Sequence, residues 1–114
     1  MTISERRCGG FVVLDLSGAL VWPRADRTLA ETVRRHVLNG WRSIVINLAE
    51  VCAIDAAGLG ALVMAFTKAR EAGGSIVLAG VRPRVRALMA VTGLIDVFET
   101  CESVEDVLSC SVRI

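Results

Sequence analysis

The sequence contains no tyrosine and a single histidine, His36. Acid-base and covalent catalysis need a poised side chain with a partner beside it, and histidine and tyrosine often fill such roles. The chain also lacks the Gly-x-Ser-x-Gly and Gly-Lys-Ser/Thr motifs that mark many hydrolases and nucleotide sites. We interpret His36 as a partly exposed structural residue of its helix. We therefore expect no catalytic residue in this chain.

Net charge and long apolar runs are missing as well. Thirteen Lys and Arg residues face twelve Asp and Glu residues, so the net charge is +1 at pH 7. Proteins that bind nucleic acid or anionic lipid usually carry a strongly basic surface, so we expect neither partner. Apolar runs such as LVMAF are far shorter than the ~20 residues of a membrane helix. Asp15 and Gly18 interrupt the apolar segment that follows Arg6 and Arg7, so we expect no export signal and a cytoplasmic location.

The four cysteines form no Cys-x-x-Cys pair, and His36 has no neighbouring ligand at metal-site spacing. We therefore expect neither a metal ion nor another cofactor. Free cysteine in a reducing compartment behaves as a small buried hydrophobic residue. This interpretation applies to Cys8, Cys52, Cys101 and Cys110.

Hydrophobic periodicity divides the chain into alternating strands and helices. The run at 43–51 is apolar at its centre, as expected for a central strand covered on both faces. Gly9 and Gly10 form the turn of an opening hairpin between the first two strands. The expected strands cover residues 2–8, 11–16, 43–51, 75–80 and 95–98.

Start signals precede three of the four expected helices. Thr28 and Glu31 have the spacing of a capping box, and Ser103 and Asp106 repeat it before the last helix. Pro83 opens another helix at its first turn, where the missing N–H costs nothing. The remaining helix covers 56–72. The sequence predicts one α/β domain over residues 1–114, with a mixed central sheet of about 4–5 strands, about four helices and no linker.

The segment CAIDAAGLGAL places Asp55 between an apolar strand and a helix that starts with small residues. The Asp55 carboxylate can accept hydrogen bonds from the free N–H groups of the first helical turn. Its charge also suits the positive end of the helix dipole. The same charge would repel an anion, which makes this glycine-rich segment a poor phosphate site. Asp55 is therefore predicted to be a helix cap.

The helix after Asp55 has two apolar sides. A rotation of 3.6 residues per turn puts Leu59, Leu62 and Phe66 on one side, which is predicted to face the core. The other side is smooth and weakly polar, although a solvated side usually carries charges. Either a neighbouring element of the same domain covers this second side, or it docks a partner. The residues on it are Ala57, Gly60, Ala61, Met64 and Lys68.

Trp22 lies in the loop before the first helix, together with Pro23 and Arg24. Tryptophan and arginine contribute strongly to protein interfaces, whereas a single large apolar residue more often packs into the core. Both interpretations stay open. If Trp22 and Met64 are exposed, they form one apolar patch around the helix start.

The order of elements and four sequence blocks resemble the STAS family, the domain shared by sulfate transporters and bacterial anti-sigma factor antagonists. The resemblance covers nearly the whole chain. It rests on Asn47-Leu48, on the Asp-x-x-Gly-Leu-Gly segment that starts at Asp55, on GGSIVLAGV at 73–81 and on VRALMAVTGLIDVFE at 85–99. It implies a regulatory protein-binding module of bacteria, involved in signalling and transcription, whose partner is a kinase-like anti-sigma factor. The docking residues that it implies are Asp55, Ala56, Ala57, Gly58, Gly60, Ala61, Met64 and Trp22.

The chain departs from this family at position 56. In antagonists, the residue directly after the Asp is usually a serine, or sometimes a threonine, that the anti-sigma factor phosphorylates. Here it is Ala56, followed by Ala57, and neither side chain has a hydroxyl group. The resemblance therefore predicts a docking module that is not switched by phosphorylation at this position.

Two alternatives use the same segment. Some stand-alone STAS proteins are cytoplasmic subunits of lipid-trafficking ABC transporters, and Ala57-Gly58-Leu59 suits that variant too. Others are scaffold subunits of stress-signalling complexes, where the acceptor residue can be absent. The complete TGLIDVFE segment and the capped last helix favour the antagonist over the transporter subunit. The sequence does not separate the scaffold subunit from the antagonist, because both use the same surface.

Overall fold

The computed structural model describes residues 2–21 and 28–112, with the side chains up to residue 108. Within these ranges the chain forms five strands and four helices in the predicted order. The strands are β1 (Thr2–Cys8), β2 (Phe11–Leu20), β3 (Ser43–Ile54), β4 (Ser75–Ala79) and β5 (Glu99–Cys101). The helices are α1 (Thr28–Leu38), α2 (Ala56–Glu71), α3 (Pro83–Val91) and α4 (Val104–Val112). The predicted fold class, an α/β fold with a mixed sheet, is confirmed.

The five strands form one sheet in the order β1-β2-β3-β4-β5. β1 pairs antiparallel with β2 through the turn at Gly9 and Gly10, which both have positive φ. All other neighbouring strands pair in parallel. Parallel neighbours need a crossover, and α1, α2 and α3 supply these connections.

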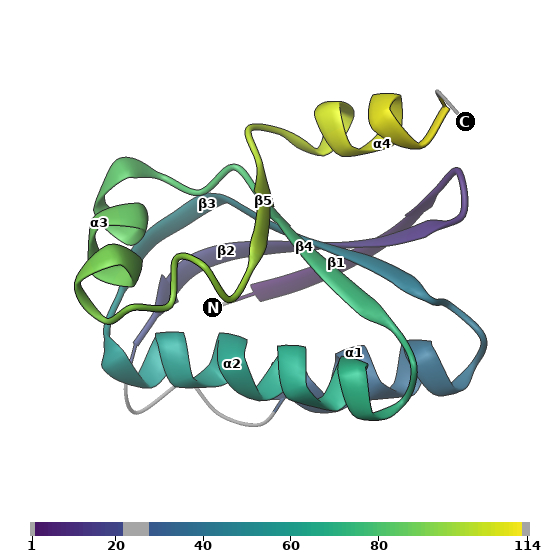
Figure 1. Ribbon diagram of the computed structural model, residues 1–114, viewed down its shortest axis with the longest axis horizontal. Coiled ribbons are helices and arrows are strands. Elements are labelled where there is room, and N and C mark those ends of the chain that lie inside the picture. Colours follow the sequence, from purple (N-terminus) through teal and green to yellow (C-terminus); the bar gives the residue numbers. More distant parts are fainter. Residues whose placement is uncertain (1, 22–27, 113–114) are drawn as a thin grey trace.

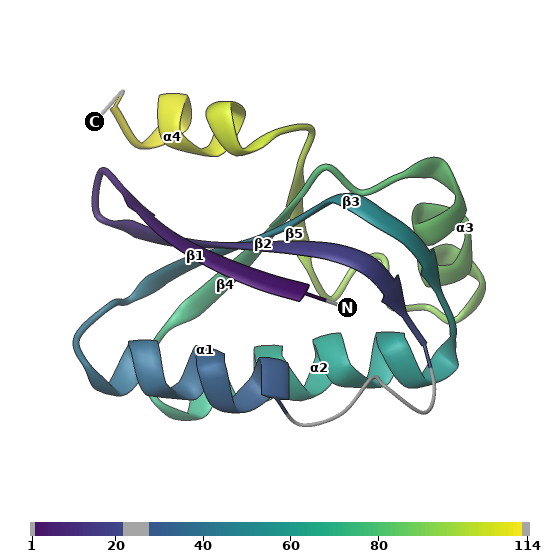
Figure 2. The ribbon, with the colours of Figure 1, turned by 180° about the vertical axis from the view of Figure 1, so that it is seen from behind.

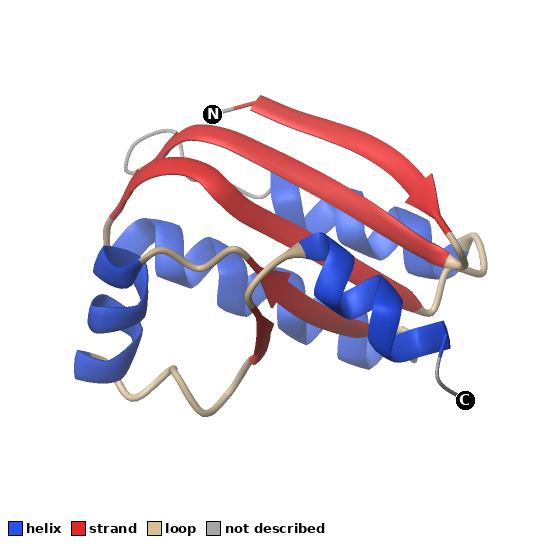
Figure 3. Ribbon diagram, turned by 90° about the horizontal axis from the view of Figure 1, so that it is seen from above, coloured by secondary structure: helices blue, strands red, loops and turns tan. Residues whose placement is uncertain are grey.

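The helices lie in two layers on the sheet. α1 and α2 lie side by side beneath one face, and α4 covers part of the opposite face (Figures 1 and 2). Figure 3, seen from above, shows α4 lying over the sheet. The larger core lies between the sheet and α1 and α2, and includes Leu14, Ile46 and Leu62. α3 sits at the end of the sheet where β3 leads into α2, so three elements meet at the start of α2 (Figure 1).

One predicted strand is wrong. Residues 95–98 are a turn, and the last strand is the three-residue β5 that follows it. The turn after α3 uses the backbone of this segment, since the N–H groups of Leu94 and Ile95 both donate to the Met89 carbonyl at 2.8 and 3.2 Å. Only Phe98 of this segment is buried, and its ring meets that of Phe66 on α2 edge to face, with 5.5 Å between the ring centres.

Two smaller predictions also fail. His36 is buried, because β1 lies over α1 and brings Glu5 Oε1 to 3.0 Å from His36 Nε2. Cys52 is exposed rather than buried, whereas Cys8 and Cys101 are half-buried. No helix within the described residues is long and apolar enough to cross a membrane.

Candidate functional site

Asp55 caps α2 as predicted. Its backbone is extended, with φ −126° and ψ −172°, and its Oδ1 accepts a hydrogen bond of 2.9 Å from the Gly58 N–H. The Asp55 carbonyl accepts the next N–H, from Leu59, at 2.9 Å. A cap of this kind stabilises a protein by about 1 kcal/mol. Asp55 therefore fixes where α2 begins and how its first turn is presented.

Gly58, one of the predicted docking residues, is buried. It is buried against the end of β2, and a Cβ at this position would overlap the Leu20 carbonyl oxygen. The same Cβ would lie 2.7 Å from Cγ1 of Ile54. The Asp55 N–H also donates to the Leu20 carbonyl, at 3.4 Å. Gly58 is thus the residue that lets the first turn of α2 approach the backbone of β2.

Ala61, another predicted docking residue, is buried as well, since only 5% of it is exposed. It continues a buried side that includes Ala65 and Ala69. α2 has both the sheet and α1 as neighbours, so its buried side is wider than the sequence pattern predicts. The sequence left open whether the second side of this helix is covered by the domain itself or docks a partner. At Ala61, the domain itself covers it.

Four predicted residues remain accessible at the start of α2. Ala56 and Gly60 are exposed, Ala57 is half-buried, and 39% of Met64 is exposed. We call these four residues the docking face. None of their side chains carries a charge, and the half-buried Asp55 carboxylate is next to them. Trp22, the last predicted docking residue, lies outside the described residues.

The structure adds two exposed residues that sequence reasoning missed, Cys52 and Ala53 at the end of β3. β4 is short and pairs with β3 only as far as Asn47, so the last residues of β3 have no strand on that side, where Arg82 Nε donates to the Ala49 carbonyl at 2.8 Å. The sequence predicts burial of Cys52 because free cysteine usually behaves as a small buried hydrophobic residue. Cys52 and Ala53 line a second groove together with Arg82 and Arg84 from the start of α3, so basic residues flank this end of β3.

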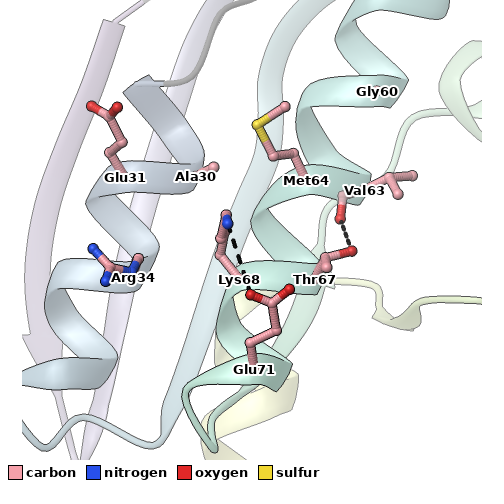
Figure 4. A pocket seen from close by; sticks show the side chains of 9 residues that line it. All are labelled: Ala30, Glu31, Arg34, Gly60, Val63, Met64, Thr67, Lys68 and Glu71. Atoms are coloured by element: carbon pink, nitrogen blue, oxygen red, sulfur yellow. Dashed lines mark hydrogen bonds and ion pairs between the residues drawn. The ribbon is translucent and has the colours of Figure 1, made fainter.

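A groove between α1 and α2 begins at the docking face. It has a volume of about 790 Å³, and Figure 4 shows Met64 pointing from α2 into the space between the two helices. Gly60 lies at one end of the groove and Glu71 at the other (Figure 4). The α1 side is formed by Ala30, Glu31 and Arg34, which sequence reasoning missed because they lie about 30 residues earlier in the chain.

A polar cluster lies on the other face of the sheet. Asp15 Oδ2 accepts a hydrogen bond of 2.7 Å from Arg6 Nε, and Asp15 Oδ1 accepts another of 2.7 Å from Asn47 Nδ2. Partial burial pushes the pKa of Asp15 upward, but the hydrogen bonds and the Arg6 charge outweigh it, so this pKa lies below its ordinary value. The cluster joins β1, β2 and β3, and is far from the docking face on the sheet's opposite side. The described residues contain no group of three His, Cys, Asp or Glu side chains that could hold a metal ion.

The fold and this site define a small α/β domain with an uncharged surface at a capped helix start. The STAS domain model matches residues 3–107, and the chain belongs to the STAS domain family. It is similar to BtrV of Bordetella bronchiseptica, a protein named as an anti-sigma factor antagonist. The two sequences are 26% identical over 105 residues, which cover 92% of this chain and 90% of BtrV.

Solved structures share the fold. An anti-sigma factor antagonist from Mycobacterium paratuberculosis superposes with a TM-score of 0.79 at 22% identity, over 96% of this chain and 92% of that one. The Bacillus anti-sigma factor antagonist SpoIIAA in its unphosphorylated form gives a TM-score of 0.71 at 17% identity, over 98% of both chains. The predicted resemblance to the STAS family is confirmed by the family match, and the solved structures confirm its fold.

Proposed function

We propose that this chain is a non-catalytic protein-binding module of the anti-sigma factor antagonist type, which docks its partner through the docking face. The observation that carries the proposal is the uncharged accessible surface of Ala56, Ala57, Gly60 and Met64 on a helix start that Asp55 holds in place. Small residues let a partner backbone approach closely, and methionine adapts to the shape of a partner surface. The partner is a kinase-like anti-sigma factor, and the chain acts on transcription in the bacterial cytoplasm.

Control of docking does not run through phosphorylation at position 56. A phosphate would add nearly two negative charges at the helix start beside Asp55, and this charge would disrupt docking of an apolar partner surface. Ala56 is exposed but has no hydroxyl group that could accept a phosphate. The chain therefore behaves like a permanently unphosphorylated antagonist, whose binding depends on its abundance or on a competing partner.

The test is to recover the tagged chain from its own cells and identify stoichiometric partners by mass spectrometry. Gly60→Glu places a charge on the docking face, and a Cβ at Gly60 has no atom within 4 Å, so the fold tolerates it. Ala87→Glu on the exposed side of α3 is the matched control. Ala61→Glu is unsuitable because Ala61 is buried.

An anti-sigma factor that is lost with Gly60→Glu and kept with Ala87→Glu supports the proposal. Recovery of transporter permease and ATPase subunits instead supports the transport alternative. Recovery of the same set of proteins by the original chain, by Gly60→Glu and by Ala87→Glu contradicts docking through this face. A stoichiometric phosphate that tracks partner release, on Thr67 or Ser43 for example, contradicts the absence of a phosphorylation switch.

A further inference from the structure

The groove between α1 and α2 has a specific shape and charge pattern. Its end at the docking face is apolar, with Ala30 on α1 facing Gly60 and Met64 on α2 (Figure 4). Gly60 is exposed and has no side chain, so an approaching side chain can reach the backbone of α2 at this end of the groove. The apolar end therefore fits one aliphatic side chain of a partner.

The rest of the groove carries two acidic and two basic side chains. Glu31 and Arg34 lie on the α1 side, and Lys68 and Glu71 on the α2 side (Figure 4). Lys68 and Glu71 pair at 3.8 Å, whereas neither Glu31 nor Arg34 forms an ion pair within the described residues. The net charge of these four groups is zero. A groove of this kind does not select a polyanion such as nucleic acid or a lipid surface, and it suits a segment with both signs of charge.

The shape of the groove also decides between two protein occupants. A second copy of this chain would present an identical groove, and two concave surfaces of about 790 Å³ would leave a void between them. Protein interfaces pack at the density of protein interiors, so such a void is unfavourable. A convex occupant fills the space. The groove runs from Gly60 to Glu71, which corresponds to about 16 Å along a helix, or three turns.

We propose that the groove between α1 and α2 binds one amphipathic helix of the docked partner, about three turns long. The helix seats an aliphatic side chain against Gly60 and Met64, and presents a basic side chain to Glu31 and an acidic one to Arg34. This inference rests on the proposed function, because Gly60 and Met64 belong to both the groove and the docking face. It adds that α1 takes part in recognition, through residues that lie outside the family's glycine segment.

The test places the photo-crosslinking residue p-benzoylphenylalanine at position 34, in the full chain and in its own cells. The control places the same residue at position 86, on the exposed side of α3. When the chain that carries this residue at position 34 is illuminated, it is expected to crosslink to the partner protein that the Gly60→Glu variant no longer recovers. The joined peptide should be helical, with an aliphatic residue and side chains of both signs.

A second measurement uses the purified partner. Arg34→Glu is expected to weaken binding roughly tenfold, mainly through a slower association that depends on salt, whereas Arg34→Lys stays within about threefold. Met64→Glu is expected to weaken it by roughly 30-fold or more, as for a central interface residue. Equal affinity for Arg34→Glu and the original chain would overturn the helix proposal.

The outcomes separate this inference from the proposed function. If Gly60→Glu loses the partner but position 34 crosslinks no better than position 86, the groove is not occupied and only this inference fails. If the residue at position 34 crosslinks two copies of this chain, the groove is occupied by a second copy, and the proposed occupant, a helix of the partner, is wrong. If Gly60→Glu loses no partner at all, the proposed function itself fails, and the groove proposal fails with it.

Discussion

Gly58 and Gly60 lie two residues apart in the same helix, yet their surroundings differ completely. A Cβ at Gly58 would overlap the backbone of β2, whereas a Cβ at Gly60 would meet no atom within 4 Å. Neither glycine has a positive φ, so backbone conformation explains neither of them. Gly58 is required because α2 starts directly against β2. Gly60 leaves an accessible gap on the surface.

This difference separates the two tasks of the first turns of α2. The inward residues Gly58 and Leu59 attach the helix to the sheet, and changes to them are expected to lower stability. The outward residues Ala56 and Gly60 contribute little to the core, and changes to them are expected to alter binding alone. The following predictions measure how well this separation holds.

Gly58→Ala is expected to have the largest effect on stability. The added methyl group overlaps the Leu20 carbonyl, and backbone atoms cannot move aside as a flexible side chain does. Overpacking of this kind costs about 3 kcal/mol of unfolding free energy. Urea denaturation followed by circular dichroism measures it, and a midpoint equal to that of the original chain would show that α2 does not need this close approach.

Asp55→Ala is expected to cost about 1 kcal/mol, because the Gly58 N–H loses its acceptor. Asp55→Asn is the matched control, since asparagine caps helices about as well as aspartate. Thermal unfolding of the three chains measures the effect. If Asn and Ala are equally destabilising, the charge of Asp55 matters more than its hydrogen bond, and the assignment as a simple cap is wrong.

Gly60→Ala is expected to raise stability by up to about 1 kcal/mol, because alanine is the better helix former and the added Cβ meets no atom. This sign is opposite to that of Gly58→Ala, which is the sharpest form of the comparison. The same urea experiment measures it. A loss of stability at Gly60 would mean that this side of α2 is not open.

Asp15 provides the smallest effect, on the sheet face away from α2. Folding lowers the pKa of Asp15 below its ordinary value of 3.8, so the ionised group stabilises the fold above about pH 4. That contribution is lost as the pH falls through the lower folded pKa. Asp15→Asn is therefore expected to be slightly less stable than the original chain at pH 6, by at most about 1 kcal/mol because Arg6 is half exposed.

Urea midpoints of the two chains from pH 2 to pH 6 test this prediction. The difference should disappear at the acid end, and binding of the partner at pH 7 should be unchanged. A difference that persists at pH 2 would assign the effect to packing rather than to the charge of Asp15.

The order of the elements could be predicted from the sequence because strand and helix periods, caps and glycine turns are local signals. Asp55 is a clear case, since a carboxylate between an apolar run and a helix has one simple structural role. The prediction of a strand at 95–98 is wrong because the segment is a turn whose Phe98 packs against Phe66, a contact that depends on another helix. A short apolar run cannot distinguish these two uses.

The candidate site was predicted only in part, for the same physical reason. Helical rotation placed Ala61 with Gly60 and Met64, but the position of α1 decides which of them is buried. The end of β3 is open because β4 is short, and the groove takes Arg34 from α1. These features depend on contacts between elements that are distant in the sequence. No local pattern carries that information.

The most direct test of the central claim is the dissociation constant of the recovered partner for the original chain and for Gly60→Glu, measured together with both unfolding midpoints. We predict affinity weakened by roughly 30-fold or more with an unchanged midpoint, since the charge enters an interface but no part of the core. Unchanged affinity would contradict docking through the start of α2. A loss of affinity that only accompanies a lower midpoint would contradict the separation of stability from binding.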